Sequence, residues 1–281
     1  MRPVSKAAVY RALGTTRQAI SQFWQRDYEH AVLADELEQK LLEKRKHHPG
    51  LGLKKAYDQI QPVGIGRDRF VALMLERGHG LEVKRSHIRT TRSGGKRFPN
   101  LIKLLIINCV NRVWQSDTTY FRLGNRFVYL TFIIDVYSRR IVGYSLSDSL
   151  RATANVQALE MALNNRQGVD LSELIFHTDG ATQYRSEQFV SLLSEHGISS
   201  SMCDVALDNA YAEKVNDVIK NEYLTRWDIQ TMAQLRTKLR QAVNNYNTER
   251  HHGQLPVKLA PDQRWSRAEY GSHARRRAAF A

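Results

Sequence analysis

Three acidic residues stand in local settings that suit metal-dependent chemistry. Asp117 interrupts an apolar, β-branched and aromatic run, and Asp179 ends a second apolar run just before a glycine. Glu213 lies in a segment with helical character. Two carboxylates at strand ends and a third on a helix can build an oxygen-ligand site for magnesium. A pair of Mg²⁺ ions, which Mn²⁺ can replace, suits cleavage and transfer of phosphodiesters.

Each of these carboxylates also has a structural interpretation. Asp179 precedes a glycine and could simply cap a turn, and Glu213 could be a solvated helix position. Asp117 lies among apolar residues, where an unpaired charge is costly, so a metal is its natural partner. Of the rival acids, Asp208 is expected to cap the helix start. Glu222, nine residues after Glu213, points to the opposite helix face. We therefore predict Asp117, Asp179 and Glu213 as the catalytic metal ligands.

Polar residues around these three invite further predictions. Asp135 ends a strand just before a turn and is predicted to be structural. Asn216 and Lys220 follow Glu213 by three and seven residues, on the same helix face. We expect both to hold DNA near the metals.

Roles beside the metal ligands or at the DNA are also expected for two histidines, an asparagine and an arginine. His177 is two residues before Asp179 and either supports the metal ligands or is a packed core histidine. Asn209 is expected to support the ligands. Arg250 and His252 contact DNA or pin the last helix to the core, and for Arg250 we favour DNA.

Positive charge is concentrated at the front of the chain. The 281 residues include 42 Lys and Arg against 28 Asp and Glu, a formal charge of +14. Residues 1–110 hold 21 basic and 10 acidic residues, whereas residues 111–281 hold 21 and 18. The basic residues could simply form a solvated surface. Their concentration in one part of the chain instead favours binding to nucleic acid, and it favours binding to a membrane surface less.

The cysteine content and the apolar runs exclude other classes. Cys109 and Cys203 are the only cysteines and form no Cys-x-x-Cys pair, so a cysteine zinc site is not expected. We expect a reduced, cytosolic chain. The N-terminus lacks an apolar signal core, and no apolar run approaches the length of a membrane span.

The first 46 residues are predicted to form a helix–turn–helix segment and a linker helix. Residues 5–26 favour two short helices around Gly14, with Ile20, Phe23 and Trp24 facing inward. Residues 29–46 favour a helix that acts as a linker or a dimer contact. If the segment reads DNA, its exposed contacts are Arg17, Gln18, Ser21 and Gln22.

Residues 47–85 predict a second helix–turn–helix module, with helices over 53–60 and 67–77 and with Arg67 at the DNA. Residues 86–110 are expected to be a basic linker along DNA phosphates or a spacer. The predicted phosphate contacts in and just before this linker are Arg85, Arg89, Arg92, Lys96 and Arg97. Residues 266–281 form a basic tail.

From residue 111 the pattern changes to strands, which gives the predicted core, residues 111–265. Strands are expected over 113–121, 127–135, 140–146, 174–178 and 198–202. Helices are expected over 153–166, 187–196, 212–223 and 232–246. The order β-β-β-α-β-α-β-α-α is that of a ribonuclease-H-like core. The fold class is therefore α/β: a five-stranded mixed sheet flanked by helices, preceded by small all-α modules.

These motifs together resemble those of a known family. The matching residues include Trp114, Asp117, Thr119 and Tyr120; Ser138, Arg139 and Gly143; His177, Asp179, Gly180, Gln183 and Tyr184; Asp208, Asn209 and Glu213; Tyr246, Asn247, Arg250, His252 and Leu255. Their order over about residues 48–265 resembles that of DDE transposases with an integrase-like core. The chain is most similar to the second-frame (OrfB-type) transposases of the IS-three group of bacterial insertion sequences.

The resemblance implies that Asp117, Asp179 and Glu213 bind the metals for DNA strand cleavage and transfer. It implies double-stranded DNA partners (terminal inverted repeats and target), a dimer or larger assembly, and an upstream-frame partner or fusion in some members. It also implies a bacterial cytoplasmic protein associated with the nucleoid. One departure is the spacing: 33 residues separate Asp179 from Glu213, where the family usually has 35. We expect a loop over 202–207 to absorb the difference.

Other functions remain open from the sequence. A regulator with a decayed nuclease core would have lost a carboxylate, and all three are present. A ribonuclease-H-like nuclease or junction resolvase would cut without joining, but the paired basic modules argue against it. A retroviral-type integrase would normally add a His/Cys zinc module, for which the cysteines are missing.

Overall fold

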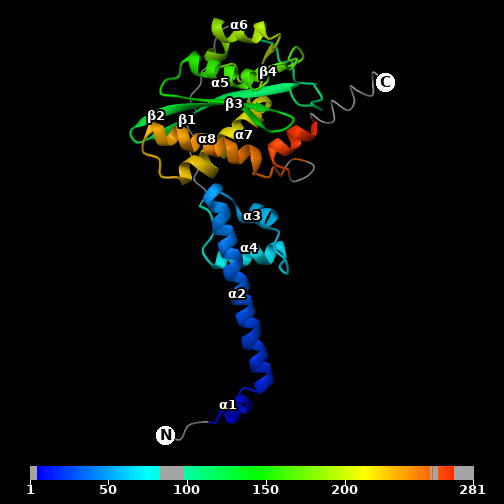
Figure 1. Cartoon of the computed structure of the whole chain (residues 1–281), viewed down its shortest axis with the longest axis vertical. Helices are drawn as coiled ribbons and strands as arrows, with labels where there is room; N and C mark the ends of the chain where they lie inside the picture. Colours follow the sequence, from blue (N-terminus) through cyan, green and yellow to red (C-terminus); the bar gives the residue numbers. More distant parts are fainter. Residues whose placement is uncertain (1–4, 83–97, 254, 256–258, 269–281) are drawn as a thin grey trace, which may run out of the picture. The chain divides into compact units, whose positions relative to one another are not determined.

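The computed structural model describes residues 5–82, 98–253, 255 and 259–268 (Figure 1). They fall in two compact units, one within residues 1–47 and 51–82 and the other within 48–50 and 83–281. Five predicted phosphate contacts lie outside the described residues: Arg85, Arg89, Arg92, Lys96 and Arg97. The same is true of the predicted basic tail from residue 269 onward.

The first unit is helical. It consists of α1 (Lys6–Ala12), α2 (Arg17–His47), α3 (Leu53–Ile60) and α4 (Arg67–Glu76). Hydroxyl side chains cap the first two helices: the Ser5 hydroxyl accepts a hydrogen bond from the Ala8 N–H at 3.3 Å, and the Thr16 hydroxyl accepts one from the Ala19 N–H at 3.1 Å.

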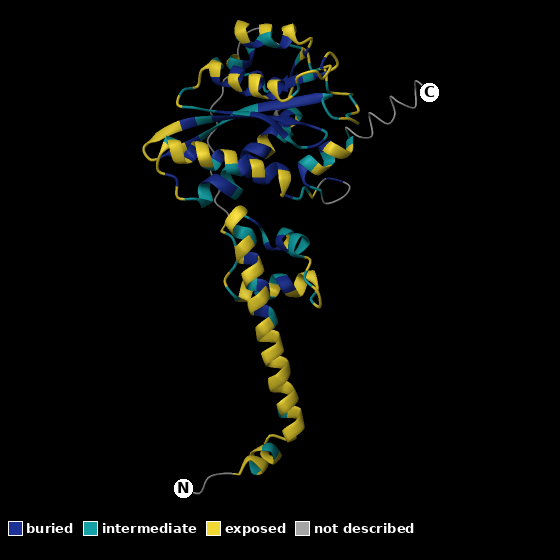
Figure 2. Ribbon diagram, in the orientation of Figure 1, coloured by how far each residue is buried: buried dark blue, intermediate teal, exposed yellow. Residues whose placement is uncertain are grey.

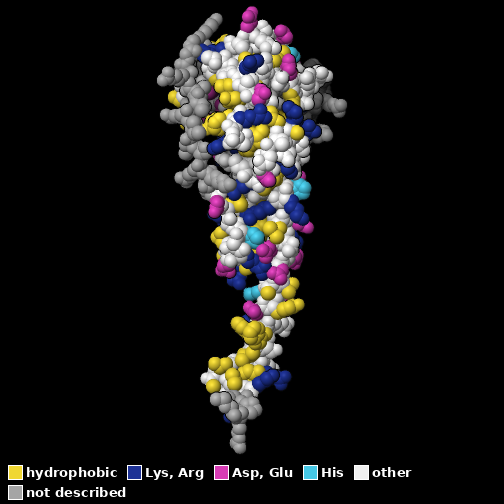
Figure 3. Space-filling view, turned by 90° about the vertical axis from the view of Figure 1, so that its left-hand side faces the viewer, with side chains coloured by type: hydrophobic (Ala, Val, Ile, Leu, Met, Phe, Trp, Pro, Cys, Tyr) yellow, Lys and Arg dark blue, Asp and Glu magenta, His cyan; other side chains and the backbone are white. Residues whose placement is uncertain are grey.

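The predicted division of the N-terminal helices is wrong. The short helix over 17–26 and the linker helix over 29–46 are one continuous helix, α2, because no Gly or Pro interrupts residues 17–47. Phe23 and Trp24, expected to face inward, are 60% and 63% exposed. Figure 2 shows the N-terminal half of α2 as a largely exposed rod, and Figure 3 shows hydrophobic side chains gathered at this end.

The core of this unit also crosses the predicted boundary at residues 46 and 47. The second half of α2 packs on α3 and α4, so these three helices share one small core. Its buried members are Leu37, Leu41, Leu51, Leu53, Ala56, Phe70 and Met74. Arg77 after α4 pairs with Asp35 at 2.8 Å and with Glu38, which fastens α4 to α2.

The second unit contains the predicted mixed sheet. Its strands are β1 (Val113–Leu123), β2 (Arg126–Asp135), β3 (Ile141–Ser147), β4 (Ile175–Thr178) and β5 (Ser199–Met202). Their order is β3-β2-β1-β4-β5. The first three strands are antiparallel neighbours, and β4 and β5 run parallel to β1. This topology confirms the ribonuclease-H-like core.

Helices cover both faces of the sheet (Figure 1). One face packs on α5 (Ala152–Asn164) and α6 (Glu187–Glu195), and the other on α7 (Ala210–Val218) and α8 (Met232–Thr248). The approach of α5 to β3 requires glycine at position 143, because a Cβ there would lie 2.2 Å from the Ala158 carbonyl oxygen.

Short irregular helices connect these elements. η1 (Thr182–Arg185) follows β4, and η2 (Ala206–Asn209) precedes α7. The single helix predicted over 212–223 is instead α7 followed by a π-helical turn, η3 (Ile219–Tyr223), and by η4 (Leu224–Arg226). Among the described residues, no helix combines the length and apolarity needed to cross a membrane.

Candidate active site

The sheet register brings Asp117 and Asp179 together. Parallel pairing of β1 with β4 ends at Ser116 opposite Thr178. Asp117 and Asp179 are therefore the next residues along these two neighbouring chain segments. Glu213 lies in the first turn of α7, which packs on β1. The structure thus places the three predicted carboxylates around one end of the β1–β4 pair.

The charges of these carboxylates oppose one another. The pKa of Asp117 is raised to about 7, first by burial and then by the negative charge of Asp179, with a smaller effect from Glu213. Burial also raises the pKa of Asp179. The pKa of Glu213 is raised by partial loss of hydration and by the charge of Asp179. Within the described chain, no Lys or Arg forms an ion pair with any of the three.

This arrangement fits a divalent cation in its donor chemistry. Carboxylate oxygens are the preferred ligands of Mg²⁺, and a cation would relieve the repulsion that raises these pKa values. The described side chains nevertheless form no cluster of three or more His, Cys, Asp or Glu close enough to enclose an ion. Closure around a metal therefore requires rotation of at least one carboxylate, and Glu213, which is exposed, is the freest to move.

Asparagines connect α7 to β1 beside these carboxylates. Asn216 donates from Nδ2 to Asp117 Oδ2 at 2.7 Å and is buried. Asn209 donates from Nδ2 to the Ser116 carbonyl oxygen at 3.0 Å, in line with its predicted supporting role. Gln115 donates to the Asp208 carbonyl oxygen at 2.7 Å. The amide of Asn216 thus holds Asp117, and the DNA contact expected of Asn216 from the sequence stays a prediction.

A network of hydroxyl groups lies on the opposite face of β1. The buried Tyr184 hydroxyl is 2.8 Å from Ser116 Oγ and 3.4 Å from Thr118 Oγ1. Thr118 Oγ1 also contacts Thr131 Oγ1 at 3.0 Å and accepts from Asn155 Nδ2 at 3.3 Å. These bonds fix the β1 backbone on both sides of Asp117. The sequence offered one signal for them, the Gln183-Tyr184 pair after Asp179.

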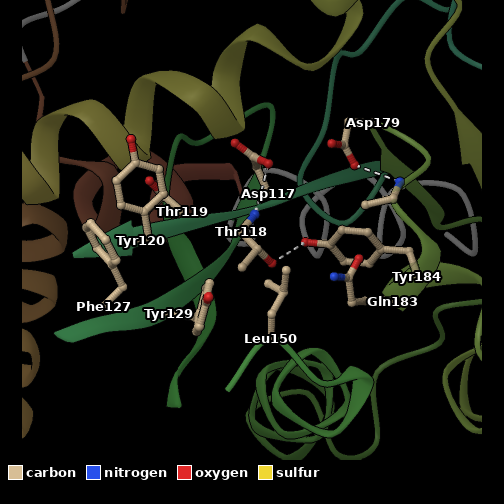
Figure 4. Close-up of a pocket in the computed structure, with 11 residues that line it drawn as sticks. Asp117, Thr118, Thr119, Tyr120, Phe127, Tyr129, Leu150, Asp179, Gln183 and Tyr184 are labelled. Atoms are coloured by element: carbon tan, nitrogen blue, oxygen red, sulfur yellow. Dashed lines mark hydrogen bonds between the residues drawn. The ribbon is translucent and has the colours of Figure 1, made fainter. Parts of the chain in front are cut away.

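A hollow of about 300 Å³ opens beside the two aspartates (Figure 4). Asp117 and Asp179 form part of its wall. Aromatic and apolar side chains from β1, β2 and the segment before α5 form the rest, together with Gln183 and Tyr184. The carboxylates are therefore accessible to a ligand.

Two of the rival carboxylates have structural partners. Asp135 is fully buried and accepts hydrogen bonds from the Ser138 N–H, the Ser138 hydroxyl and the Asn111 N–H, at 2.7–2.8 Å. Asp208 does not cap α7 as expected. Its carboxylate accepts instead from the Asp204 and Val205 N–H groups, and it therefore stabilises the loop after β5.

His177 is a buried histidine on β4. Its Nδ1 is 2.9 Å from Ser201 Oγ on β5, and its Nε2 has no hydrogen-bond partner within the described chain. Burial lowers its pKa to about 4, so the ring is neutral near neutral pH. These contacts favour the packed histidine over direct support of Asp179.

The basic residues of the core have different surroundings. Arg250 is buried and donates two hydrogen bonds to Glu222, at 2.8 and 2.9 Å. This geometry favours the pinning role for Arg250 over the predicted DNA contact. Lys220 donates to Thr119 Oγ1 at 3.1 Å and lies 4.7 Å from the centre of the Tyr120 ring, at the hollow. His252 is half-buried, and its DNA contact stays a prediction.

The predicted DNA contacts of the first unit are exposed. These residues, in the first two turns of α2 and at the start of α4, are Arg17, Gln18, Ser21, Gln22 and Arg67. Their exposure is compatible with DNA binding, which stays a prediction.

Comparison with known sequences identifies the core. Integrase core domain families match residues 107–206 and 198–258. A putative transposase for insertion sequence element IS986/IS6110 of Mycobacterium tuberculosis is 39% identical over 119 residues, 41% of this chain and 43% of the relative. The transposase for IS629 of Shigella sonnei is 29% identical, covering 73% of this chain and 70% of the relative. The chain thus spans less than half the length of the first of these relatives.

Among solved structures, the catalytic core domain of HTLV-2 integrase in complex with magnesium is similar, with a TM-score of 0.45 and 18% identity. The similarity covers 54% of this chain and 95% of the integrase domain.

Proposed function

Since this chain belongs to the DDE transposases with an integrase-like catalytic core, we propose that it cuts the ends of a mobile DNA element and joins them to target DNA. The observation that carries the proposal is that Asp117 and Asp179 lie side by side at an accessible hollow, where no described Lys or Arg forms an ion pair with them. The negative charge of Asp179 raises the pKa of Asp117 and of Glu213, and carboxylates gathered in this way favour binding of a cation.

Asp117, Asp179 and Glu213 would hold the divalent metal, Mg²⁺ or Mn²⁺. When bound, two such ions activate the attacking oxygen and stabilise the leaving oxygen of a phosphodiester. Nothing in the proposal requires a covalent bond between protein and DNA.

The chain's own residues prepare this site. The Thr118 N–H and the Asn216 amide donate to the two oxygens of Asp117, at 2.9 and 2.7 Å, and so fix the plane of its carboxylate. The Ala181 N–H does the same for one oxygen of Asp179 at 3.0 Å. Fixed ligands reduce the reorganisation that metal binding would otherwise require.

The proposed partners are double-stranded DNA, as element ends and as target, and further copies of the chain. Joining two ends to one target needs both ends in one assembly, so a dimer or larger oligomer is expected. The charge of +14 supports DNA binding that weakens as salt concentration rises. The exposed residues of α2 and α4 would contact the ends, and an upstream-frame protein is a further possible partner.

A cleavage and strand-transfer assay tests this proposal. The substrates are labelled duplexes from the ends of the DNA element that carries the gene, with Mg²⁺ present. The wild type should give cleaved and joined products, and Glu213→Gln should reduce both by about a thousandfold, because it removes a metal ligand. Glu195→Gln, an exposed glutamate on α6, is the matched control and should retain activity.

The products distinguish the proposal from its rivals. Cleavage without joining would indicate a nuclease instead of a transposase. Specific binding of the ends without cleavage, in the wild type and both variants, would contradict catalysis by this chain alone.

A further inference from the structure

The hollow beside the aspartates has two chemically different sides. In Figure 4, Tyr120, Phe127 and Tyr129 lie on one side, Asp179 and Gln183 lie on the other, and Asp117 lies between them. The hollow thus runs from the carboxylates to a group of aromatic rings.

The hollow exists because β1 loses its neighbour. Pairing with β4 ends at Ser116, so beyond Asp117 the edge of β1 has no partner strand in the described structure. The side chains of Thr118 and Tyr120 border this opening. An unpaired strand edge next to a reactive centre offers space and backbone hydrogen-bonding groups to a substrate.

The aromatic side is accessible rather than packed. Tyr120 and Phe127 meet edge to face, with ring centres 5.3 Å apart. Phe127 is 49% exposed, and Leu150 at the foot of the hollow is 48% exposed. Exposed apolar side chains around a concave site are characteristic of ligand binding.

Polar groups are placed where a nucleotide would need them. The Lys220 ammonium lies 4.7 Å from the centre of the ring of Tyr120, which lines the hollow, and suits a backbone phosphate beside that ring. The Gln183 side chain lines the hollow and makes no hydrogen bond within the described chain. Its amide can therefore donate to and accept from the edge of a base.

We propose that this hollow receives one unstacked DNA base, the base adjacent to the phosphodiester held at Asp117 and Asp179. The inference rests on the proposed function. A phosphate at the two carboxylates carries its own nucleoside, and the hollow begins at the same two residues. Its volume of about 300 Å³ suits a single base and excludes a duplex. Stacking on aromatic rings would offset the loss of stacking within the DNA.

A filled hollow tests the proposal. Leu150→Trp places a large side chain at the foot of the hollow, and the exposure of Leu150 makes the change tolerable for folding. Val169→Trp, at a comparably exposed apolar position in the same unit, is the matched control. The substrates are element-end duplexes, either intact or with one abasic nucleotide on either side of the cleaved bond. Thermal unfolding confirms that each variant is folded.

On intact DNA, Leu150→Trp should cleave about tenfold more slowly than the wild type and Val169→Trp. One of the abasic positions should restore Leu150→Trp to within about threefold of the wild type on the same substrate. Phe127→Ala, which removes part of the stacking surface, should be impaired on intact DNA and equal to the wild type on that abasic substrate. Wild-type rates for Leu150→Trp, or rescue at neither position, would overturn the proposal.

A binding measurement separates this proposal from the proposed function. 2-Aminopurine at the same position should change its fluorescence on binding to the wild type and not on binding to Leu150→Trp. If that difference is found although the wild type cleaves nothing, the result supports the base site and contradicts the transposase activity. If the wild type cleaves and 2-aminopurine responds identically to both proteins, the result contradicts the base site and supports the transposase activity.

Discussion

Asp117 and Asp135 lie on neighbouring antiparallel strands of one sheet, and burial raises the pKa of both. Their partners differ. Asp135 ends β2 and accepts three hydrogen bonds from the turn that follows and from Asn111. Asp117 accepts two, and the negative charges of Asp179 and Glu213 raise its pKa further.

This difference separates a carboxylate that serves the fold from one that serves chemistry. At Asp135 three donors of the chain itself reduce the cost of burial. At Asp117 it is left partly uncompensated, and the neighbouring carboxylates add to it. A carboxylate of this kind lowers the stability of the metal-free protein, and a bound cation raises that stability again.

The largest expected effect is on the rate of strand cleavage, and it should differ strongly between Asp117→Asn and Asp135→Asn. Asp117→Asn removes a proposed metal ligand and should lower strand cleavage by about a thousandfold. Asp135→Asn, assayed at a temperature where it is folded, should remain within about tenfold of the wild type. Initial rates on labelled element ends measure both. If both folded variants lost cleavage activity equally, Asp117 would not differ from Asp135 in its role in the reaction.

The stability effects should have the opposite order. Asp135→Ala leaves three donors without their acceptor and should lower the free energy of unfolding by about 2–4 kcal/mol. Asp117→Ala removes a repelled carboxylate, so the metal-free protein should lose less than about 1 kcal/mol or become more stable. Urea unfolding in the presence of a chelator gives both values. Greater destabilisation by Asp117→Ala would show that Asp117 is held by the fold as Asp135 is.

Sequence predicted the core well because its signals are local. The strands expected over 113–121 and 127–135 are β1 and β2, and Gly124 and Asn125 form the turn between them. Asp117 and Asp179 could be placed at the same end of the sheet because each is tied to a strand. The structural role of Asp135 could also be predicted, since an aspartate before a turn has its donors nearby in sequence.

The contacts that the sequence did not reveal join residues far apart in the chain. The partner of Arg250 is Glu222, and the partner of Asn216 is Asp117, 99 residues away. Such distant pairs depend on how α7, η3 and α8 pack. Trp24 has the spacing of an inward-facing residue, but the described part of the first unit has no element that covers it.

Loss of the Asn216 side chain should have a smaller effect on cleavage than loss of Asp117 itself, because the Asn216 amide is one of the two donors to Asp117. Asn216→Ala should reduce cleavage by about tenfold, by loosening the carboxylate that the metal must use. Raised Mg²⁺ concentration should recover part of the loss. The control is Asn221→Ala. Asn221 lies in the π-helical turn η3, and its amide donates a hydrogen bond to Asp217 of α7, so its loss should change the rate little. A rate for Asn216→Ala that Mg²⁺ cannot improve would argue against a role in positioning the ligand.

The raised pKa of Asp117 should also make stability depend on pH. In the metal-free protein the pKa of Asp117 is raised from 3.8 to about 7. Between these values the folded protein holds a proton that the unfolded chain has released. The free energy of unfolding should therefore fall as pH rises from about 4 to 7, by up to about 1.4 kcal/mol per pH unit, and level off above.

Asp117→Asn cannot release this proton, so its stability relative to the wild type should increase with pH over the same window. Urea unfolding with a chelator, from about pH 5 to 8, measures that difference. Asp135 contributes in the same direction in both proteins and cancels in the comparison. Asp148→Asn, at an exposed aspartate, should show no such trend. A difference between Asp117→Asn and wild type that does not change with pH would mean that Asp117 is already ionised in the folded protein across this range, and that the neighbouring carboxylates do not hold a proton on it.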